Sequence, residues 1–241
     1  MTNYVLGDET KDRLRRASTA SIATCLFKRG MRSQVVQGAL PVSRKAHNMV
    51  GQAFTLRTMP AREDRNPISV FRNEDHPQRV AVERCPPGFV LVIDSRKDAR
   101  AASAGAILVT RLQVRGVAGV VTDGGFRDAE AIGGLAIPAF HVRPSAPTNL
   151  TLHEAIDIDA PIGCGDAPVF PGDVIVGDGD GVVVIPAHLA DEVGEECAGM
   201  EDFEAFVWES VRDGHSIIGL YPPTHEDTLQ RYETWRARGK S

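Results

Sequence analysis

Segments with helical spacing of apolar positions alternate along the chain with short runs rich in valine and isoleucine. Apolar residues recur at helical spacing over residues 8–30, where Lys28-Arg29-Gly30 supplies the cations and the glycine typical of a helix end. A long helix is predicted from residue 187 to about residue 212. The Ala-rich segment 97–113, with Gly105 inside it, also favours a helix.

Strand-sized apolar runs fill the middle of the chain. The hairpin signal is clear at residues 174–176 and 182–186, two runs separated by the Gly-Asp-rich turn 177–181. Charged residues concentrate at 60–77, which we expect to be a surface loop or a short helix. The other predicted elements are strands at 50–58, 89–94, 117–122 and 135–142, the last broken by Pro138, and a short helix at 128–132.

We expect one α/β domain over residues 1–241, with a core at about residues 15–215. The chain of 241 residues is 42% hydrophobic, which is enough for one substantial core, and no repeat period is visible. Residues 221–241 are polar and are expected to form an arm or a partly ordered extension.

Composition narrows the function classes. A formal charge of −5, with no basic stripe interleaved with aromatics, argues against a nucleic-acid surface. No apolar run approaches the length of a membrane span, and the N-terminus lacks a signal-peptide pattern, so we expect a cytoplasmic protein without membrane association. The four cysteines form no Cys-x-x-Cys pair and are expected to be free thiols.

The strongest candidate for chemistry is the run Gly119–Asp128, where an apolar strand stops at Asp-Gly-Gly and Arg127 and Asp128 follow. The glycines are expected to take positive φ and to let a ligand approach the backbone. Arg127 can bind a carboxylate through two hydrogen bonds, and Asp128 can hold a hard cation. The alternative is a surface Arg-Asp pair, with Asp128 favoured at a helix start.

Two further features have equally open interpretations. If Gly105 opens a helical turn, the free amides beside it can bind a carboxylate; otherwise it is a glycine tolerated within a helix. In the acidic helix near the C-terminus, Glu201 and Glu204 share a face and could reach a neighbouring subunit, although most such residues form a solvated face. The turn 177–181 lacks calcium-loop spacing, and no nucleotide-binding, zincin or hydrolase motif is present.

Three blocks resemble the RraA-like family. They are the run Gly119–Asp128, the block Pro171–Asp178 with Val182–Pro186, and Ser18-Thr19-Ala20, and the similarity spans about residues 15–215. The family includes the regulator of ribonuclease activity A and class II pyruvate aldolases for 4-hydroxy-4-methyl-2-oxoglutarate and 4-carboxy-4-hydroxy-2-oxoadipate. The resemblance implies a swivelling β/β/α fold, layered with N- and C-terminal helices, in a homotrimer or homohexamer with sites between subunits.

The same resemblance implies roles for individual residues. Asp128 would hold Mg²⁺ or Mn²⁺, and Arg127 would bind a 2-keto acid and stabilise its enolate. Glu201 or Glu204 of a neighbouring chain would position the waters of the metal. The substrate carboxylate would be bound by the backbone amides of Gly105, Ala106, Ile107 and Leu108.

One departure from the family pattern concerns the metal. The aldolases usually carry an acidic residue where this chain has Ala106, and loss of such a partner weakens a metal site about 10- to 100-fold. We expect a metal-dependent aldolase for a 4-hydroxy-2-oxo acid, with oxaloacetate decarboxylation as a side activity. The alternatives are a non-catalytic regulator that binds a ribonuclease or helicase, and a lyase or hydratase for sugar-derived 2-keto acids.

Overall fold

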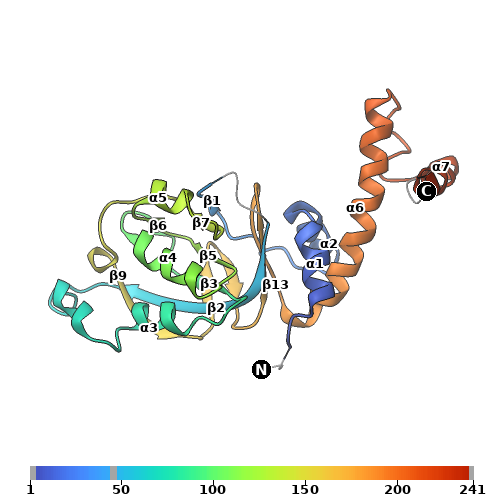
Figure 1. Ribbon diagram of the computed structural model, residues 1–241. Coiled ribbons are helices and arrows are strands. Elements are labelled where there is room, and N and C mark those ends of the chain that lie inside the picture. Colours follow the sequence, from blue (N-terminus) through green and yellow to red (C-terminus); the bar gives the residue numbers. More distant parts are fainter. Residues whose placement is uncertain (1–3, 44–47, 239–241) are drawn as a thin grey trace.

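The computed structural model describes residues 4–43 and 48–238, and within them the largest β-sheet has eight strands (Figure 1). Its hydrogen-bonded order is β1 (Leu40–Pro41), β7 (Ala139–His141), β5 (Gly119–Thr122), β3 (Val90–Ile93), β2 (Met49–Pro60), β12 (Val174–Asp178) and β13 (Gly181–Ile185), with β9 (His153–Ile158) also paired to β2. A mixed α/β architecture is therefore confirmed.

Strands β2, β3, β5 and β7 are parallel, so their carboxyl ends meet along one edge of the sheet. All residues of β3 and β5 are buried, which explains why their sequences are continuously apolar rather than alternating. The predicted hairpin is confirmed: β12 and β13 pair antiparallel, with Val174 opposite Ile185 and Asp178 opposite Gly181.

Two smaller sheets were not predicted. The first joins β4 (Ala102–Ala104), β6 (Gly125–Phe126) and β8 (Arg143–Pro144) in parallel, and the second pairs β10 (Ile162–Cys164) with β11 (Ala167–Val169). The first half of the helix predicted at 97–113 is wrong, because β4 precedes Gly105 and α4 (Ala106–Val114) begins after it. Alanine's helix propensity is overridden here by strand pairing with β6.

Helices α3 (Pro77–Arg84), α4 and α5 (Ala129–Gly133) enclose one apolar core with β3 and β5, whereas α1 (Asp8–Arg16), α2 (Thr19–Lys28) and α6 (Ala190–Arg212) enclose another with β12 and β13. The single helix predicted at 8–30 is wrong. It divides at Ala17-Ser18, because Ser18 caps α2 by accepting a hydrogen bond from the Ser21 amide.

The charged segment at 60–77 contains a short 3-10 helix, η1 (Ile68–Arg72), which agrees with one of the two alternatives predicted for it. The strand predicted at 135–142 is shorter than expected, because only Ala139–His141 is extended there. A 3-10 turn, η3 (Ala187–Leu189), precedes α6. Another, η2 (Asn149–Thr151), precedes β9.

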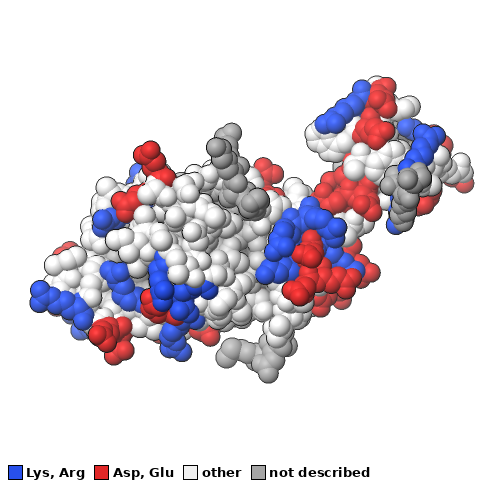
Figure 2. Space-filling model, viewed as in Figure 1, with Lys and Arg blue, Asp and Glu red and all other residues white. Residues whose placement is uncertain are grey.

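The C-terminal half of α6 projects away from the sheet, and α7 (Glu226–Arg238) lies beside its far end (Figure 1). Phe206 of α6 packs against Tyr232 and Trp235 of α7, so the tail expected to be an arm or partly ordered extension contains a docked helix. Residues 239–241 of that tail lie outside the described residues. On the face drawn in Figure 2, basic and acidic side chains are intermixed around α1, α2 and α6.

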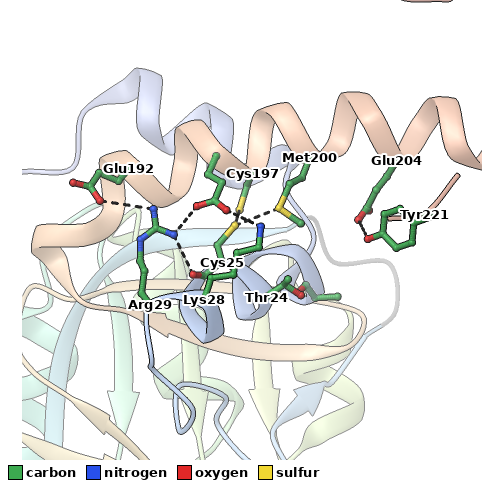
Figure 3. A network of polar contacts seen from close by, with 11 residues as sticks. Thr24, Cys25, Lys28, Arg29, Glu192, Cys197, Met200, Glu204 and Tyr221 are labelled. Carbon is green, nitrogen blue, oxygen red and sulfur yellow. Dashed lines mark hydrogen bonds and ion pairs between the residues drawn. The ribbon is translucent and has the colours of Figure 1, made fainter. Parts of the chain in front are cut away.

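The cysteines are free thiols, as predicted, and all four are buried. Cys25 of α2 lies with its Sγ 3.5 Å from Sγ of Cys197 on α6 and 3.4 Å from Sδ of Met200, as Figure 3 shows. The contact with Cys25 and, after it, burial raise the pKa of Cys197 well above its usual range. These sulfur atoms form part of the apolar contact between the two helices.

Candidate functional site

The small sheet brings Gly105 next to Arg127 and Asp128. Ala104 pairs with Phe126, and the Arg127 amide donates a 2.9 Å hydrogen bond to the Ala104 carbonyl. A Cβ atom on Gly105 would lie 3.2 Å from Oδ2 of Asp128 and 3.5 Å from Cβ of Arg127. A side chain at position 105 would therefore crowd these two residues, which explains the glycine there.

A pocket of about 140 Å³ opens where these residues meet. Four of its lining residues come from β4 and α4, and others come from α3, the β6–α5 turn and the segment before β9. Of the site residues predicted from sequence, Ala106, Glu201 and Glu204 are not part of the lining. The lining residues are Phe71, Gln78, Arg79, Ala102, Ala104, Gly105, Ile107, Leu108, Arg127, Asp128, Thr148 and Asn149.

Gly105 occupies the N-cap position of α4, so the conditional prediction that it opens a helix is the one observed. Of the amides predicted to bind a carboxylate, that of Leu108 already donates a 3.0 Å hydrogen bond to the Gly105 carbonyl. Within the described residues, the amides of Ala106 and Ile107 have no protein acceptor. They remain available for an anion at the helix N-terminus.

Arg127 and Asp128 are both exposed, and neither side chain forms an ion pair with any residue in the described ranges. Asp128 has φ 55° and ψ 38°, the left-handed region, and its side chain makes no capping hydrogen bond to α5. The interpretation of these residues as a mutual ion pair or a side-chain cap is therefore not what the structure shows. An aspartate held in this conformation without a local partner is typical of functional sites.

The prediction that the glycines of the Asp-Gly-Gly bend have positive φ is wrong. Neither Gly124 nor Gly125 has positive φ. A Cβ atom on Gly124 would lie 2.6 Å from Oγ of Ser103, and one on Gly125 would lie 2.6 Å from Cβ of Ser145. The two glycines are required for close packing of the small sheet, and the left-handed residue is Asp128.

A buried polar network surrounds Asp123, the residue that follows β5, and was not predicted from the sequence. The Asp123 carboxylate, which is 1% exposed, accepts hydrogen bonds from the amides of Ser95 (2.6 Å), Lys97 (2.9 Å) and Gly165 (3.1 Å). The hydroxyls of Ser95, Ser103 and Thr122 also bond to one another. The position of Thr122-Asp123 directly after an apolar strand was the available signal. The network fixes the turn that carries Arg127.

Glu201 and Glu204 are not brought to this pocket within one chain. Glu201 accepts hydrogen bonds from the Ser18 amide (2.9 Å) and the Ser21 hydroxyl (3.0 Å). Glu204 accepts one from the Tyr221 hydroxyl at 2.7 Å, and Figure 3 shows these two side chains meeting beside α6. Among the described residues, no group of three or more His, Cys, Asp or Glu side chains is arranged to hold a metal.

The fold and the pocket define a class: a mixed α/β protein in which the N-terminus of α4, a guanidinium and a carboxylate lie together at one pocket. The family model described as "RraA-like: Aldolase/RraA" matches residues 19–184. The chain belongs to the RraA-like family, as its sequence blocks predicted.

Individual relatives support the same assignment. A Halalkalibacterium halodurans protein named "Putative 4-hydroxy-4-methyl-2-oxoglutarate aldolase" is 40% identical over 117 residues, which are 47% of this chain and 53% of that protein. The match thus spans about half the length of that relative.

No helix in the described part of the chain is both long enough and apolar enough to cross a membrane.

Solved structures show the fold. An uncharacterized protein from Pseudomonas syringae pv. tomato superposes with a TM-score of 0.75 at 22% identity, covering 88% of this chain and 96% of that one. Streptomyces coelicolor RraAS2, described as an unusual member of the RNase ES inhibitor RraA protein family, gives a TM-score of 0.73 at 28% identity over 83% of this chain and 96% of its own. The predicted RraA-like fold is confirmed.

Proposed function

We propose that the protein is a divalent-metal-dependent class II pyruvate aldolase, which cleaves a 4-hydroxy-2-oxo acid and also decarboxylates oxaloacetate. The observation that carries this proposal is that the guanidinium of Arg127 and the carboxylate of Asp128 line one pocket at the N-terminus of α4, and that neither has an ion-pair partner among the described residues. Membership of the Aldolase/RraA family and the name of the Halalkalibacterium relative support it.

In this proposal each protein group has one task. The amides of Ala106 and Ile107 bind the carboxylate of the 2-keto acid. Arg127 donates hydrogen bonds to the 2-keto oxygen and stabilises the negative charge that develops there when the carbon–carbon bond breaks. Retro-aldol cleavage and oxaloacetate decarboxylation both leave a pyruvate enolate, so the same groups serve both reactions.

Mg²⁺ or Mn²⁺ fits Asp128, because Mg²⁺ in proteins keeps several waters and needs only one or two carboxylates. The Asp128 carboxylate is exposed and has no protein partner among the described residues. A bound ion supplies Lewis-acid stabilisation of the developing oxyanion. We further propose a homotrimer or homohexamer in which Glu201 or Glu204 of a neighbouring subunit holds the waters of the ion. Ala106 contributes no carboxylate to this site.

The test is metal-dependent release of pyruvate from oxaloacetate and from a series of 4-hydroxy-2-oxo acids. Wild-type protein is expected to lose activity with EDTA and to regain it with Mg²⁺ or Mn²⁺. Arg84→Ala is a matched control, because Arg84 is exposed at the end of α3 and does not line the pocket. Activity that is indifferent to EDTA and equal in Arg127→Ala contradicts the proposal.

A second candidate function rests on the likeness to Streptomyces RraAS2, whose description places it in a family of ribonuclease inhibitors. In that case the chain would be a non-catalytic regulator that binds a ribonuclease or a helicase. Tight binding of purified ribonuclease E, together with no turnover of any 2-keto acid, would favour this candidate over the aldolase.

A further inference from the structure

A second guanidinium lines the same pocket. Arg79 is the third residue of α3, the helix between β2 and β3, and is remote in sequence from Arg127. It forms no ion pair with a described residue, and its Cζ lies 4.6 Å from the centroid of the Phe71 ring. The pocket therefore contains two arginines, and Asp128 is its only carboxylate among the described residues.

Several contacts hold Arg79 in place. The neighbouring Gln78 is buried, and its side-chain amide donates a 2.6 Å hydrogen bond to the Ser103 carbonyl, which ties α3 to β4. The His76 ring packs edge-on against Phe71 with centroids 5.1 Å apart, so Phe71 contacts both His76 and Arg79. A guanidinium stacked on a ring keeps its N–H groups free in its own plane, where a carboxylate can bind.

We propose that Arg79 is a specificity-determining residue that binds the second carboxylate of a dicarboxylic 2-oxo acid. This inference rests on the proposed function for the orientation of the substrate, whose keto-acid end lies at Arg127 and the α4 amides. The far end of such a substrate carries a negative charge. Arg79 lines the pocket, has no ion pair with any described residue and has no role in the proposed chemistry.

Asn149 is another polar residue of the lining. It is 8% exposed, and its Oδ1 accepts a 3.3 Å hydrogen bond from the Thr148 hydroxyl. No described residue accepts a hydrogen bond from its Nδ2, so this group can donate to a ligand. A carboxylate near Arg79 and Asn149 would receive one charged and one neutral hydrogen-bond donor.

The first experiment compares two substrates that differ only at the far end. 4-Hydroxy-2-oxoglutarate has a carboxylate where 4-hydroxy-2-oxopentanoate has a methyl group. Wild-type protein is expected to cleave the dicarboxylate with a kcat/KM about 10- to 100-fold higher, the value of a charged hydrogen-bonded pair. Arg79→Gln should abolish that preference and leave kcat/KM for the monocarboxylate within about 2-fold.

The second experiment separates this inference from the proposed function. 2-Oxoglutarate and 2-oxopentanoate lack the 4-hydroxyl group and cannot undergo retro-aldol cleavage, so calorimetry with them measures binding alone. Wild-type protein should bind 2-oxoglutarate about 10- to 100-fold more tightly, and Arg79→Gln should remove the difference. Arg79→Lys should retain part of it, because lysine keeps the charge but not the planar donor pair.

Arg84→Gln is the matched control, since Arg84 lies on the same helix, is exposed and does not line the pocket. It should keep the wild-type preference, and thermal melting should show that every variant is folded. Equal binding of the two acids by wild-type protein, or an unchanged preference in Arg79→Gln, would overturn the inference. A binding preference that depends on Arg79, without turnover of any substrate, would uphold it and reject the aldolase proposal.

Discussion

Charged side chains are used in opposite ways at the α2–α6 contact and in the pocket beside α4. At the first, Glu196 accepts hydrogen bonds from Lys28 (2.9 Å) and Arg29 (2.6 Å), and the three groups join two helices far apart in sequence. In the pocket, Arg127 and Asp128 are adjacent in sequence, yet each lacks an ion-pair partner among the described residues.

The difference follows from what each region must hold. Glu196, whose side chain is 29% exposed, accepts hydrogen bonds from two cations that lower its pKa to about 2, so its negative charge stabilises the folded state. Arg127 and Asp128 follow a turn that is held by the hydrogen bonds of Asp123, and their charges remain available to a ligand. Substitutions should therefore reduce stability in the first region and function in the second.

The largest effect is expected at Arg127. Arg127→Ala should lower kcat/KM for pyruvate release about 100- to 1,000-fold, as removal of an oxyanion-stabilising donor does. Its free energy of unfolding should change by less than about 0.5 kcal/mol, because the exposed side chain has no protein partner. Urea unfolding and steady-state kinetics on one preparation measure both quantities. A large loss of stability would show that Arg127 is structural.

Asp128→Asn should rank second. The substitution keeps a residue that tolerates the left-handed conformation but removes the charge that attracts a divalent ion. Mn²⁺ affinity, followed by electron paramagnetic resonance, should fall at least about 10-fold. Asp180→Asn, in the β12–β13 turn, is the control for nonspecific cation binding. Equal Mn²⁺ binding by both variants would remove Asp128 from the proposed metal site.

Glu196→Gln tests the other side of the comparison. It should destabilise the protein by about 1 kcal/mol at pH 7 without changing the rate of turnover. The effect is smaller than the pKa shift alone implies, because solvent screens the ion pairs. Because the folded pKa is lowered from 4.5 to about 2, the stabilisation is present above pH 4.5 and is lost as the pH falls through that window. Urea unfolding at pH 7 and pH 3 should show the variant and wild type converging. Glu195→Gln, an exposed neighbour, should match wild type at both pH values.

The smallest effect is expected at Glu204. Its hydrogen bond from Tyr221 is exposed, so Glu204→Gln should change stability by less than about 0.5 kcal/mol. That bond is the main cause of the raised pKa of Tyr221, and the variant should return this pKa toward its ordinary value in a spectrophotometric titration. Loss of Mn²⁺ affinity in Glu204→Gln would instead identify it as the glutamate that serves a neighbouring site. Glu201→Gln, which keeps an oxygen for Ser18 and Ser21, gives the parallel measurement.

Several strands and turns could be predicted from local sequence alone. The β12–β13 hairpin and buried strands β3 and β5 follow from apolar runs with glycine-rich or proline-rich ends, and the structure contains them. The break at Ser18 was missed because helical spacing continues across it, although the serine cap was visible. Strand β4 was missed because its pairing partner, β6, lies more than 20 residues downstream, and alanine alone does not distinguish strand from helix.

By itself, the sequence determined the family and the α/β class, because these depend on short motifs and local periodicity. It also singled out Arg127 and Asp128 as the candidate site residues, which stays a prediction. Only the tertiary structure decided that Gly105 lies where a side chain would crowd Asp128, that Asp123 anchors the turn and that Arg79 lines the same pocket. Those contacts depend on strand pairing and helix packing between distant segments, and no local pattern specifies which distant residue will be the neighbour.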